Sequence, residues 1–189
     1  MPLLQVIVAS TRPGRVGRAV GEWFVSAAEA HGRFDVELVD LAEVALPFLD
    51  EPKHPRLREY EHEHTMRWSA TIERADAFAF VMPEYNFGYS APLKNAIDFL
   101  WHEWTDKPVA LVGYGGVSGG LRAMQVLKPV LSSVRLVPVA EVPIPFVHQR
   151  LQDGRLEPNV PMEEGAAGAL DGLARMAEVL APARSRAAS

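Results

Sequence analysis

A short apolar run followed at once by a proline restricts the possible folds of this chain more than any other feature. Residues 77–82 (Ala-Phe-Ala-Phe-Val-Met) contain no polar side chain, which is typical of a strand buried on both faces of a parallel sheet. Pro83 ends the strand because it has no N–H group for pairing with a neighbouring strand. After a polar loop, Ser90 can cap a helix, and apolar residues between 93 and 100 recur at helical spacing. The stretch predicts a strand–loop–helix unit, and ligands of open α/β sheets bind at such strand ends.

Strand-like and helical patterns alternate along the rest of the chain. The expected strands cover residues 3–9, 34–40, 77–82, 107–114 and 134–137. The expected helices cover residues 19–28, 57–75, 90–100, 121–132 and 161–180, the fourth of them helical to about residue 127 with a kink or an end at Pro129. Residues 138–147 contain three prolines and are expected to run extended across the surface. The alternation predicts an α/β fold, a doubly wound five-stranded parallel sheet in the order 2-1-3-4-5 with helices on both faces.

The composition is that of an ordinary globular protein and narrows the range of partners. With 189 residues, 48% of them hydrophobic, the chain is expected to form one domain over 1–181 and a tail over 182–189. A net charge of −5 disfavours a nucleic-acid partner, and the absence of cysteine excludes thiolate chemistry and Cys-ligated metals. The run 61–64 (Glu-His-Glu-His) predicts no metal site, because helix residues two apart do not face each other. Without a bilayer-spanning run or a signal-peptide pattern, we expect a cytoplasmic protein with no membrane partner.

Three of the expected strand-end loops carry groups suited to a ligand. Residues 10–18 combine hydroxyls, glycines and arginines ahead of a helix, where free N–H groups favour a phosphate, and Arg12 is the best charged candidate. Residues 83–89 offer hydrogen-bonding groups beside aromatic faces, which suit a planar heterocycle, although a merely structural turn is an open alternative. Residues 113–120 are rich in glycine and allow a ligand to approach the backbone closely. Together the three loops suggest a mononucleotide cofactor.

Several motifs in these loops resemble those of the NADPH-dependent FMN reductase family, whose members have a flavodoxin-like fold. The motifs are Ser10-Thr11-Arg12-Pro13-Gly14-Arg15, Pro83-Glu84-Tyr85-Asn86 followed by Pro92-Leu93-Lys94-Asn95-Ala96-Ile97-Asp98, and Tyr114-Gly115-Gly116. The Pro-Glu-Tyr-Asn tetrapeptide ahead of a helix is the most specific of them. The resemblance covers most of the chain and implies FMN and NADPH as cofactors.

The resemblance also assigns roles to individual residues. The FMN phosphate is expected at Ser10, Arg12 and the loop amides near Val16 and Gly17. The ribityl chain and one isoalloxazine edge are expected at Pro83, Glu84, Tyr85 and Asn86. The other edge of the ring is expected at Gly115, Gly116 and Ser118. Since Val16 stands where relatives often carry a hydroxyl, the phosphate contact there is expected from the backbone alone.

The implied activity is that of an NAD(P)H-dependent oxidoreductase with ping-pong kinetics. NADPH passes a hydride to N5 of the flavin, and a quinone, free flavin or similar small acceptor then takes the electrons. Because the flavin carries the chemistry, no catalytic side chain is assigned. Arg15 or Arg18 is a candidate for the 2′-phosphate of NADPH. The resemblance further implies a homodimer or homotetramer, which would place Trp101, Trp104 and the segment 47–55 near the interface; a place in the core is the open alternative for the two tryptophans.

Two other functions remain open on the sequence. Residues 116–120 match the G-x-S-x-G motif of serine hydrolases, with Ser118 as nucleophile, Glu141 as acid and His148 as base. That hypothesis requires His148 near Ser118. The second alternative is a non-catalytic protein that uses bound FMN as a redox sensor, and its pocket residues would be the same.

Overall fold

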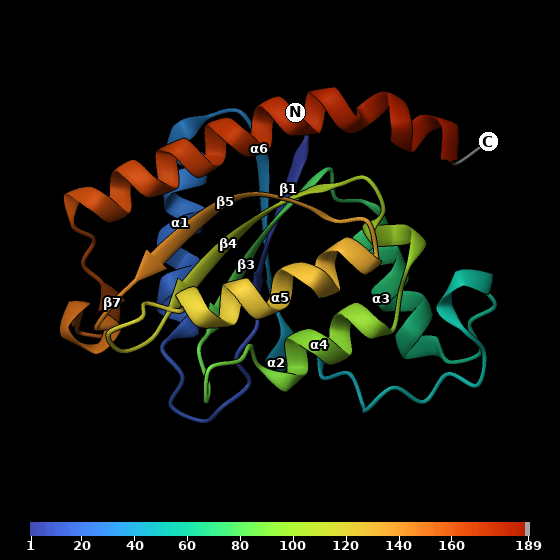
Figure 1. Cartoon of the computed structure of the whole chain (residues 1–189), viewed down its shortest axis with the longest axis horizontal. Coiled ribbons are helices and arrows are strands. Elements are labelled where there is room, and N and C mark those ends of the chain that lie inside the picture. Colours follow the sequence, from blue (N-terminus) through green and yellow to red (C-terminus); the bar gives the residue numbers. More distant parts are fainter. Residues whose placement is uncertain (188–189) are drawn as a thin grey trace.

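The computed structural model describes residues 1–187, and its centre is a five-stranded parallel sheet in the order β2-β1-β3-β4-β5 (Figure 1). The strands are β1 (Leu3–Val8), β2 (Asp35–Asp40), β3 (Ala77–Pro83), β4 (Pro108–Tyr114) and β5 (Val137–Ile144). The α-helices are α1 (Gly17–His31), α2 (Leu41–Val44), α3 (Glu63–Glu73), α4 (Ala91–Asp98), α5 (Leu121–Ser133) and α6 (Val160–Ala187). The flavodoxin-like strand order predicted from the sequence is confirmed.

Helices cover both faces of the sheet, so the protein has two hydrophobic cores. Helices α1 and α6 lie on one face, and α3, α4 and α5 lie on the other (Figure 1). Every residue of β3 is buried, with Phe78 and Phe80 in the core beneath α3–α5 and Ala79 and Val81 in the core beneath α1 and α6. Successive side chains of a strand point to opposite faces of the sheet, so β3 contributes its phenylalanines to one core and its smaller residues to the other. The apolar run at residues 77–82 therefore forms β3, the central strand of the sheet.

The fifth strand differs from the prediction. The expected strand at 134–137 is wrong: Val134 is the C-cap of α5, and β5 runs from Val137 to Ile144. The prolines that favoured an extended surface run are tolerated because β5 is an edge strand, paired with β4 alone. Pro138 and Pro143 lie in this strand, and the register shifts at Val109/Ala110 of β4, opposite the first of them. The strand-end loop that follows β5 was therefore misplaced as well.

Two helices also have different limits from those expected. The helix predicted over 57–75 is divided into a 3₁₀ turn (Pro55–Leu57) and α3, because the backbone N–H groups of Glu61 and His62 bond to the Glu51 carboxylate instead. Helix α6 continues to Ala187, beyond the expected end at 180, and its Arg184 pairs with Asp76 at 3.1 Å. Residues 188 and 189 of the expected tail lie outside the described residues. Within residues 1–187 no helix is long and apolar enough to cross a membrane.

Candidate cofactor site

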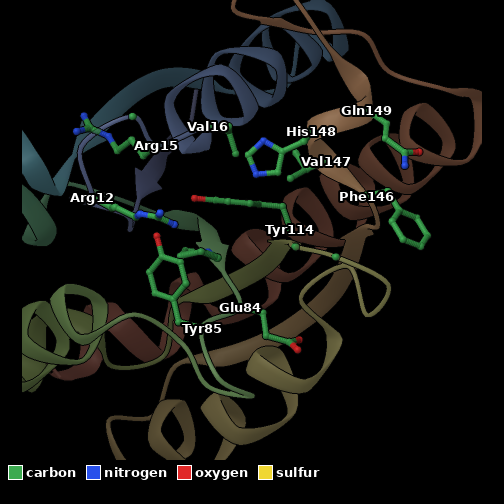
Figure 2. A pocket seen from close by; sticks show the side chains of 14 residues that line it. Arg12, Arg15, Val16, Glu84, Tyr85, Tyr114, Phe146, Val147, His148 and Gln149 are labelled. Atoms are coloured by element: carbon green, nitrogen blue, oxygen red, sulfur yellow. The ribbon is translucent and has the colours of Figure 1, made fainter.

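A pocket of about 360 Å³ opens at the carboxyl edge of the sheet, where the loops after β1, β3 and β4 meet (Figure 2). Of the residues expected to bind the cofactor, those that line the pocket are Arg12, Val16, Pro83, Glu84, Tyr85, Gly115 and Gly116. Ser10, Gly17, Asn86 and Ser118 are not among the residues that line it. The volume is within the usual range for a small-molecule site. The three loops singled out from the sequence thus surround one cavity.

The start of α1 forms one end of the pocket. The N-cap residue is Val16, which supplies no capping side chain, and the first helical turn contains no acidic residue. The leading N–H groups of a helix have no intrahelical acceptor, so this turn presents free donors and the positive end of the helix dipole. Close by, the buried Ser10 hydroxyl lies 2.9 Å from the Tyr85 hydroxyl. This end of the pocket has the chemistry of an anion site.

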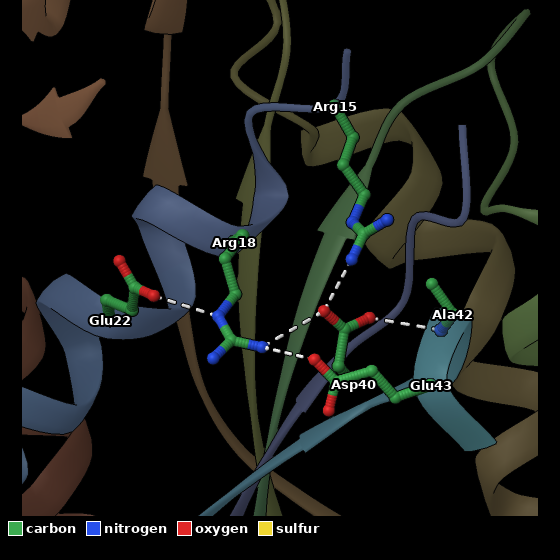
Figure 3. A network of polar contacts seen from close by, with 6 residues as sticks. All are labelled: Arg15, Arg18, Glu22, Asp40, Ala42 and Glu43. Carbon is green, nitrogen blue, oxygen red and sulfur yellow. Dashed lines mark hydrogen bonds and ion pairs between the residues drawn. The ribbon is translucent and has the colours of Figure 1, made fainter. Parts of the chain in front are cut away.

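Three arginines belong to the same loop, and their surroundings differ. The buried Asp40 accepts hydrogen bonds from Arg15 at 2.5 Å and from Arg18 at 3.3 Å, while Arg18 also pairs with the more exposed Glu22 and Glu43 (Figure 3). Arg12 has no carboxylate partner among the described residues, and its side chain extends into the pocket (Figure 2). Arg12 is therefore the uncompensated positive charge of the pocket wall. Arg15 also lines the pocket, but its charge and that of Arg18 are already matched by carboxylates.

On the opposite wall, Glu84 joins two of the loops. Its carboxylate accepts the backbone N–H of Arg122 at 3.1 Å and a side-chain N–H of the same residue at 3.2 Å. Burial acts to raise the pKa of Glu84, but hydrogen bonds from Ser118, Arg122 and the Ala123 amide outweigh it and leave the pKa below its ordinary value. Glu84 is thus a cap for α5 supplied by another loop. Its side chain lines the pocket, but its negative charge is already paired with Arg122 at the start of α5.

The tip of the 83–89 loop is a tight turn that faces away from the pocket lining. Tyr85 and Gly88 exchange two backbone hydrogen bonds of 2.9 Å, and Asn86 and Phe87 between them have φ angles of 49° and 69°. Positive φ at both central residues is the geometry of a type I′ turn, which Asn adopts readily. The guanidinium of Arg122 lies 4.2 Å from the centre of the Phe87 ring. Asn86 is consequently an exposed turn residue rather than part of the lining.

Two parts of the pocket received no cofactor-binding role from the sequence, although Tyr114 belongs to a motif of the family and His148 was considered as a hydrolase base. One is Tyr114, the last residue of β4, whose ring forms the floor (Figure 2). The other is the segment 146–149, which follows β5 and contributes Phe146 and His148 to the rim. The second omission follows from the misplaced fifth strand, since the end of any parallel strand in this sheet reaches the same edge. The aromatic ring of Tyr114 did not by itself predict a ligand contact, because an aromatic residue at a strand end can equally pack in a hydrophobic core.

The geometry of Ser118 is unlike that of a hydrolase nucleophile. A nucleophile elbow places the serine on the sharp turn that joins strand to helix, whereas Ser118 lies within a longer loop between Tyr114 and Leu121. Its hydroxyl lies close enough to Glu84 to help lower the pKa of that carboxyl group. Within residues 1–187 no hydrogen bond links Ser118 to His148. The pairing that the hydrolase hypothesis requires is therefore missing from the described part of the chain.

Comparison with known proteins agrees with the geometry of the pocket. The chain is 38% identical over 162 residues to an NAD(P)H-dependent FMN reductase of Schizosaccharomyces pombe, covering 84% of this chain and 80% of that protein. It is 45% identical over 62 residues to an NADPH:quinone oxidoreductase of Arabidopsis thaliana, covering 31% of this chain and 32% of that protein. The solved structure of FerB, a flavoenzyme NAD(P)H:(acceptor) oxidoreductase of Paracoccus denitrificans, is 25% identical and superposes with a TM-score of 0.73 over 95% of this chain and 98% of that one.

The family profile described as NADPH-dependent FMN reductase matches residues 2–149, which include every wall of the pocket. That match, together with relatives that share more than a third of their residues with most of this chain, shows that the chain belongs to the NADPH-dependent FMN reductase family.

Proposed function

We propose that this chain is an NAD(P)H:acceptor oxidoreductase that binds FMN in the pocket of Figure 2 and works by a ping-pong mechanism. Family membership supports the class of enzyme and its cofactors, FMN and a nicotinamide nucleotide. The donor set at the start of α1 is the single observation that carries the assignment of the pocket. The acceptor that we propose is a quinone, a free flavin or a similar small molecule.

The residues present fit a flavin mononucleotide at both ends of the pocket. At the α1 end, unpaired amides, the Ser10 hydroxyl and the Arg12 guanidinium match a phosphate monoester, which accepts several hydrogen bonds and carries negative charge. At the other end, Gly115 and Gly116 leave the backbone open to a flat ring, and a Cβ added at Gly116 would meet no atom within 4 Å. The charge, the donors and the space needed by FMN are therefore all provided by this chain.

Bound flavin supplies the redox chemistry, accepting a hydride at N5 and returning the electrons to an acceptor. The protein's own part is to hold and orient it. The loop at residues 10–17 would hold the phosphate of FMN, and the backbone of Pro83–Tyr85 would border its ribityl chain. The Glu84 contacts to α5 keep the second and third loops in register, which maintains the width of the slot for the ring. The exposed Phe146 and His148 lie at the mouth, where a second substrate would enter.

We also propose that the active form is a homodimer or homotetramer. Large apolar side chains are exposed on the described surface, among them Phe48 at 87% and, in the loop after β3, Phe87 at 64% of their full area. A second copy that covered them would remove this apolar surface from water. Sedimentation of the purified chain at several concentrations tests the proposal, and a monomer throughout would contradict it.

A visible spectrum tests the function most directly. Purified protein is mixed with FMN, desalted, and recorded before and after anaerobic addition of NADPH. We expect a retained flavin band that NADPH bleaches and that a quinone restores, with parallel lines in double-reciprocal plots of rate against the two substrates. A retained band that NADPH and NADH both leave intact would favour a sensor. Loss of the flavin on desalting, with no binding in a direct titration, would contradict the assigned pocket.

A further inference from the structure

We infer that the Tyr114 hydroxyl donates a hydrogen bond to the phosphate of FMN from beneath the first turn of α1, and so selects the phosphorylated flavin over riboflavin. The inference rests on the proposed function, and it concerns a residue that lies outside the phosphate loop, at the end of β4. It gives this tyrosine a role in binding specificity rather than in the redox step.

The first observation is where the hydroxyl lies. A Cβ built on Gly17, the first residue of α1, would be 2.5 Å from the Tyr114 hydroxyl oxygen and 3.4 Å from the ring carbon that carries it. The hydroxyl therefore occupies the space directly against the helix start, and only glycine at position 17 leaves room for it. Figure 2 shows the Tyr114 ring edge-on, with its oxygen directed toward the end of the pocket formed by Arg12, Arg15 and Tyr85.

The second observation is that this hydroxyl is buried without a hydrogen-bond partner. Tyr114 is 4% exposed, and its oxygen is among the buried polar atoms of the described chain that form no hydrogen bond of acceptable geometry. The neighbouring Ser10 hydroxyl bonds to Tyr85 at 2.9 Å; it also lies close enough to the Tyr114 oxygen to lower the pKa of that group, but the two hydroxyls do not reach the geometry of a hydrogen bond. Leaving a buried donor unpaired costs folding free energy, so such groups are uncommon and call for an explanation. A ligand atom above the helix start would supply the missing acceptor.

The chemistry of the position favours a phosphate oxygen as that acceptor. Burial raises the pKa of the Tyr114 hydroxyl, and the neighbouring Ser10 and Arg15 only partly offset this, so the group is a neutral donor at physiological pH. A neutral donor can face a phosphate dianion without adding a charge that the apoprotein would have to balance. Asp40 already holds the charges of Arg15 and Arg18, and Val16 has no hydroxyl. Tyr114 thus supplies a hydroxyl donor at a helix start that lacks one of its own.

Binding of two flavins to the Tyr114→Phe variant tests the inference without any turnover. FMN and riboflavin are titrated into apoprotein, and binding is followed by quenching of flavin fluorescence. A hydrogen bond to a charged group contributes enough that we expect FMN affinity to fall by about 10- to 100-fold, while riboflavin affinity changes by less than about 3-fold. The matched control is Tyr60→Phe, which removes the hydroxyl of a partly buried tyrosine that is bonded to Glu103 far from the pocket, and this variant should leave both affinities unchanged.

Stability of the apoprotein gives a second and independent readout. Because Tyr114→Phe removes an unpartnered buried hydroxyl, we expect it to leave resistance to urea unchanged or to increase it. Gly17→Ala should lower that resistance in the wild-type background, and Tyr114→Phe should relieve most of the loss, since the remaining contacts of the new methyl group are 3.4 Å. Equal losses in both backgrounds would show that the hydroxyl does not lie against α1 and would overturn the inference.

The outcomes separate this inference from the proposed function. A wild-type chain that binds FMN, and a Tyr114→Phe variant with an unchanged ratio of FMN to riboflavin affinity, would overturn the inference and leave the function standing. A loss of affinity shared by both flavins would place the hydroxyl on the ribityl chain and equally overturn the phosphate assignment. Failure of the wild-type chain to bind either flavin would overturn both.

Discussion

The carboxylate of Glu84, at the end of β3, lies 3.1 Å from the backbone nitrogen of Arg122, the second residue of α5. This contact joins two strand-end loops that are separated in sequence by the whole of α4 and β4. The residue before α5 is Gly120, which has no capping side chain, so the carboxylate from the other loop takes the place of an N-cap. One acidic side chain therefore both stabilises a helix and sets the spacing of two pocket walls.

Replacing Glu84 with glutamine tests this cap through its pH dependence. At neutral pH we expect the free energy of unfolding to fall by about 1–2 kcal/mol, as for the loss of a charged cap. Since the folded-state pKa of Glu84 is below its ordinary value, its stabilisation is complete above the unfolded-state pKa and is lost as the pH falls through the folded-state pKa. The difference between wild type and Glu84→Gln should therefore shrink below about pH 4.

Urea unfolding at neutral and at acid pH measures that difference. Glu164→Gln is the matched control, because Glu164 is exposed on α6, and it should have almost no effect at either pH. A Glu84→Gln variant as stable as wild type at neutral pH would show that the carboxylate does not cap α5.

Two glycines of the third loop should differ in their tolerance of alanine. Gly120 has a φ of +88°, and a Cβ there would lie 2.7 Å from backbone atoms of Gly113 and Tyr114. Because backbone cannot move aside cheaply, Gly120→Ala should cost about 2–5 kcal/mol in the free energy of unfolding. At Gly116 no atom lies within 4 Å of the added Cβ, so Gly116→Ala should be within about 0.5 kcal/mol of wild type. Thermal and urea unfolding of the pair measure both; similar losses at the two sites would contradict this loop geometry.

The pairing of Asp40 with two arginines predicts a buried ion-pair effect. Its side chain is 1% exposed and also accepts the backbone N–H of Ala42, so Asp40→Asn should lower the free energy of unfolding by about 2–3 kcal/mol. Glu43, which pairs with Arg18 at 2.9 Å but is 72% exposed, provides the control. Glu43→Gln should change stability by no more than about 0.5 kcal/mol. If the two variants unfold at the same urea concentration, the buried pairing of Figure 3 does not stabilise the fold.

The sheet was predictable from the sequence because its strands follow strong local rules. The run at 77–82 and the similar run at 107–114 are apolar enough to indicate burial on both faces, and alternation with helices then restricts the strand order. The last strand was not predictable in the same way. Pro138 and Pro143 argue against a strand unless it is known to be at the sheet edge, and its edge position is a property of the whole sheet.

The pocket was predictable in outline and not in its contacts. Strand-end loops identified where a ligand would bind, since parallel strands all end at one edge. Whether a side chain in such a loop faces the cavity depends on turn geometry and on distant partners. Asn86 lies at the exposed tip of a type I′ turn, and the Ser118 hydroxyl lies beside Glu84, whose pKa it helps to lower. The position of the Tyr114 hydroxyl depends on the absence of a side chain at Gly17, a relation that no local pattern expresses.

The role of Arg12 can be tested without disturbing the fold. Its guanidinium lines the pocket and has no carboxylate partner within residues 1–187, so its loss should leave the free energy of unfolding within about 0.5 kcal/mol of wild type. Removal of a charge-assisted contact to phosphate should weaken FMN binding by about 10- to 100-fold and leave riboflavin binding almost unchanged.

The control is Arg33→Ala, which changes the net charge equally. Arg33 lies far from the pocket and pairs with Glu178 at 2.7 Å, so its loss should leave both affinities unaltered. Fluorescence titration of the two variants with both flavins makes the comparison. Equal FMN affinity in Arg12→Ala and Arg33→Ala would remove Arg12 from the phosphate site.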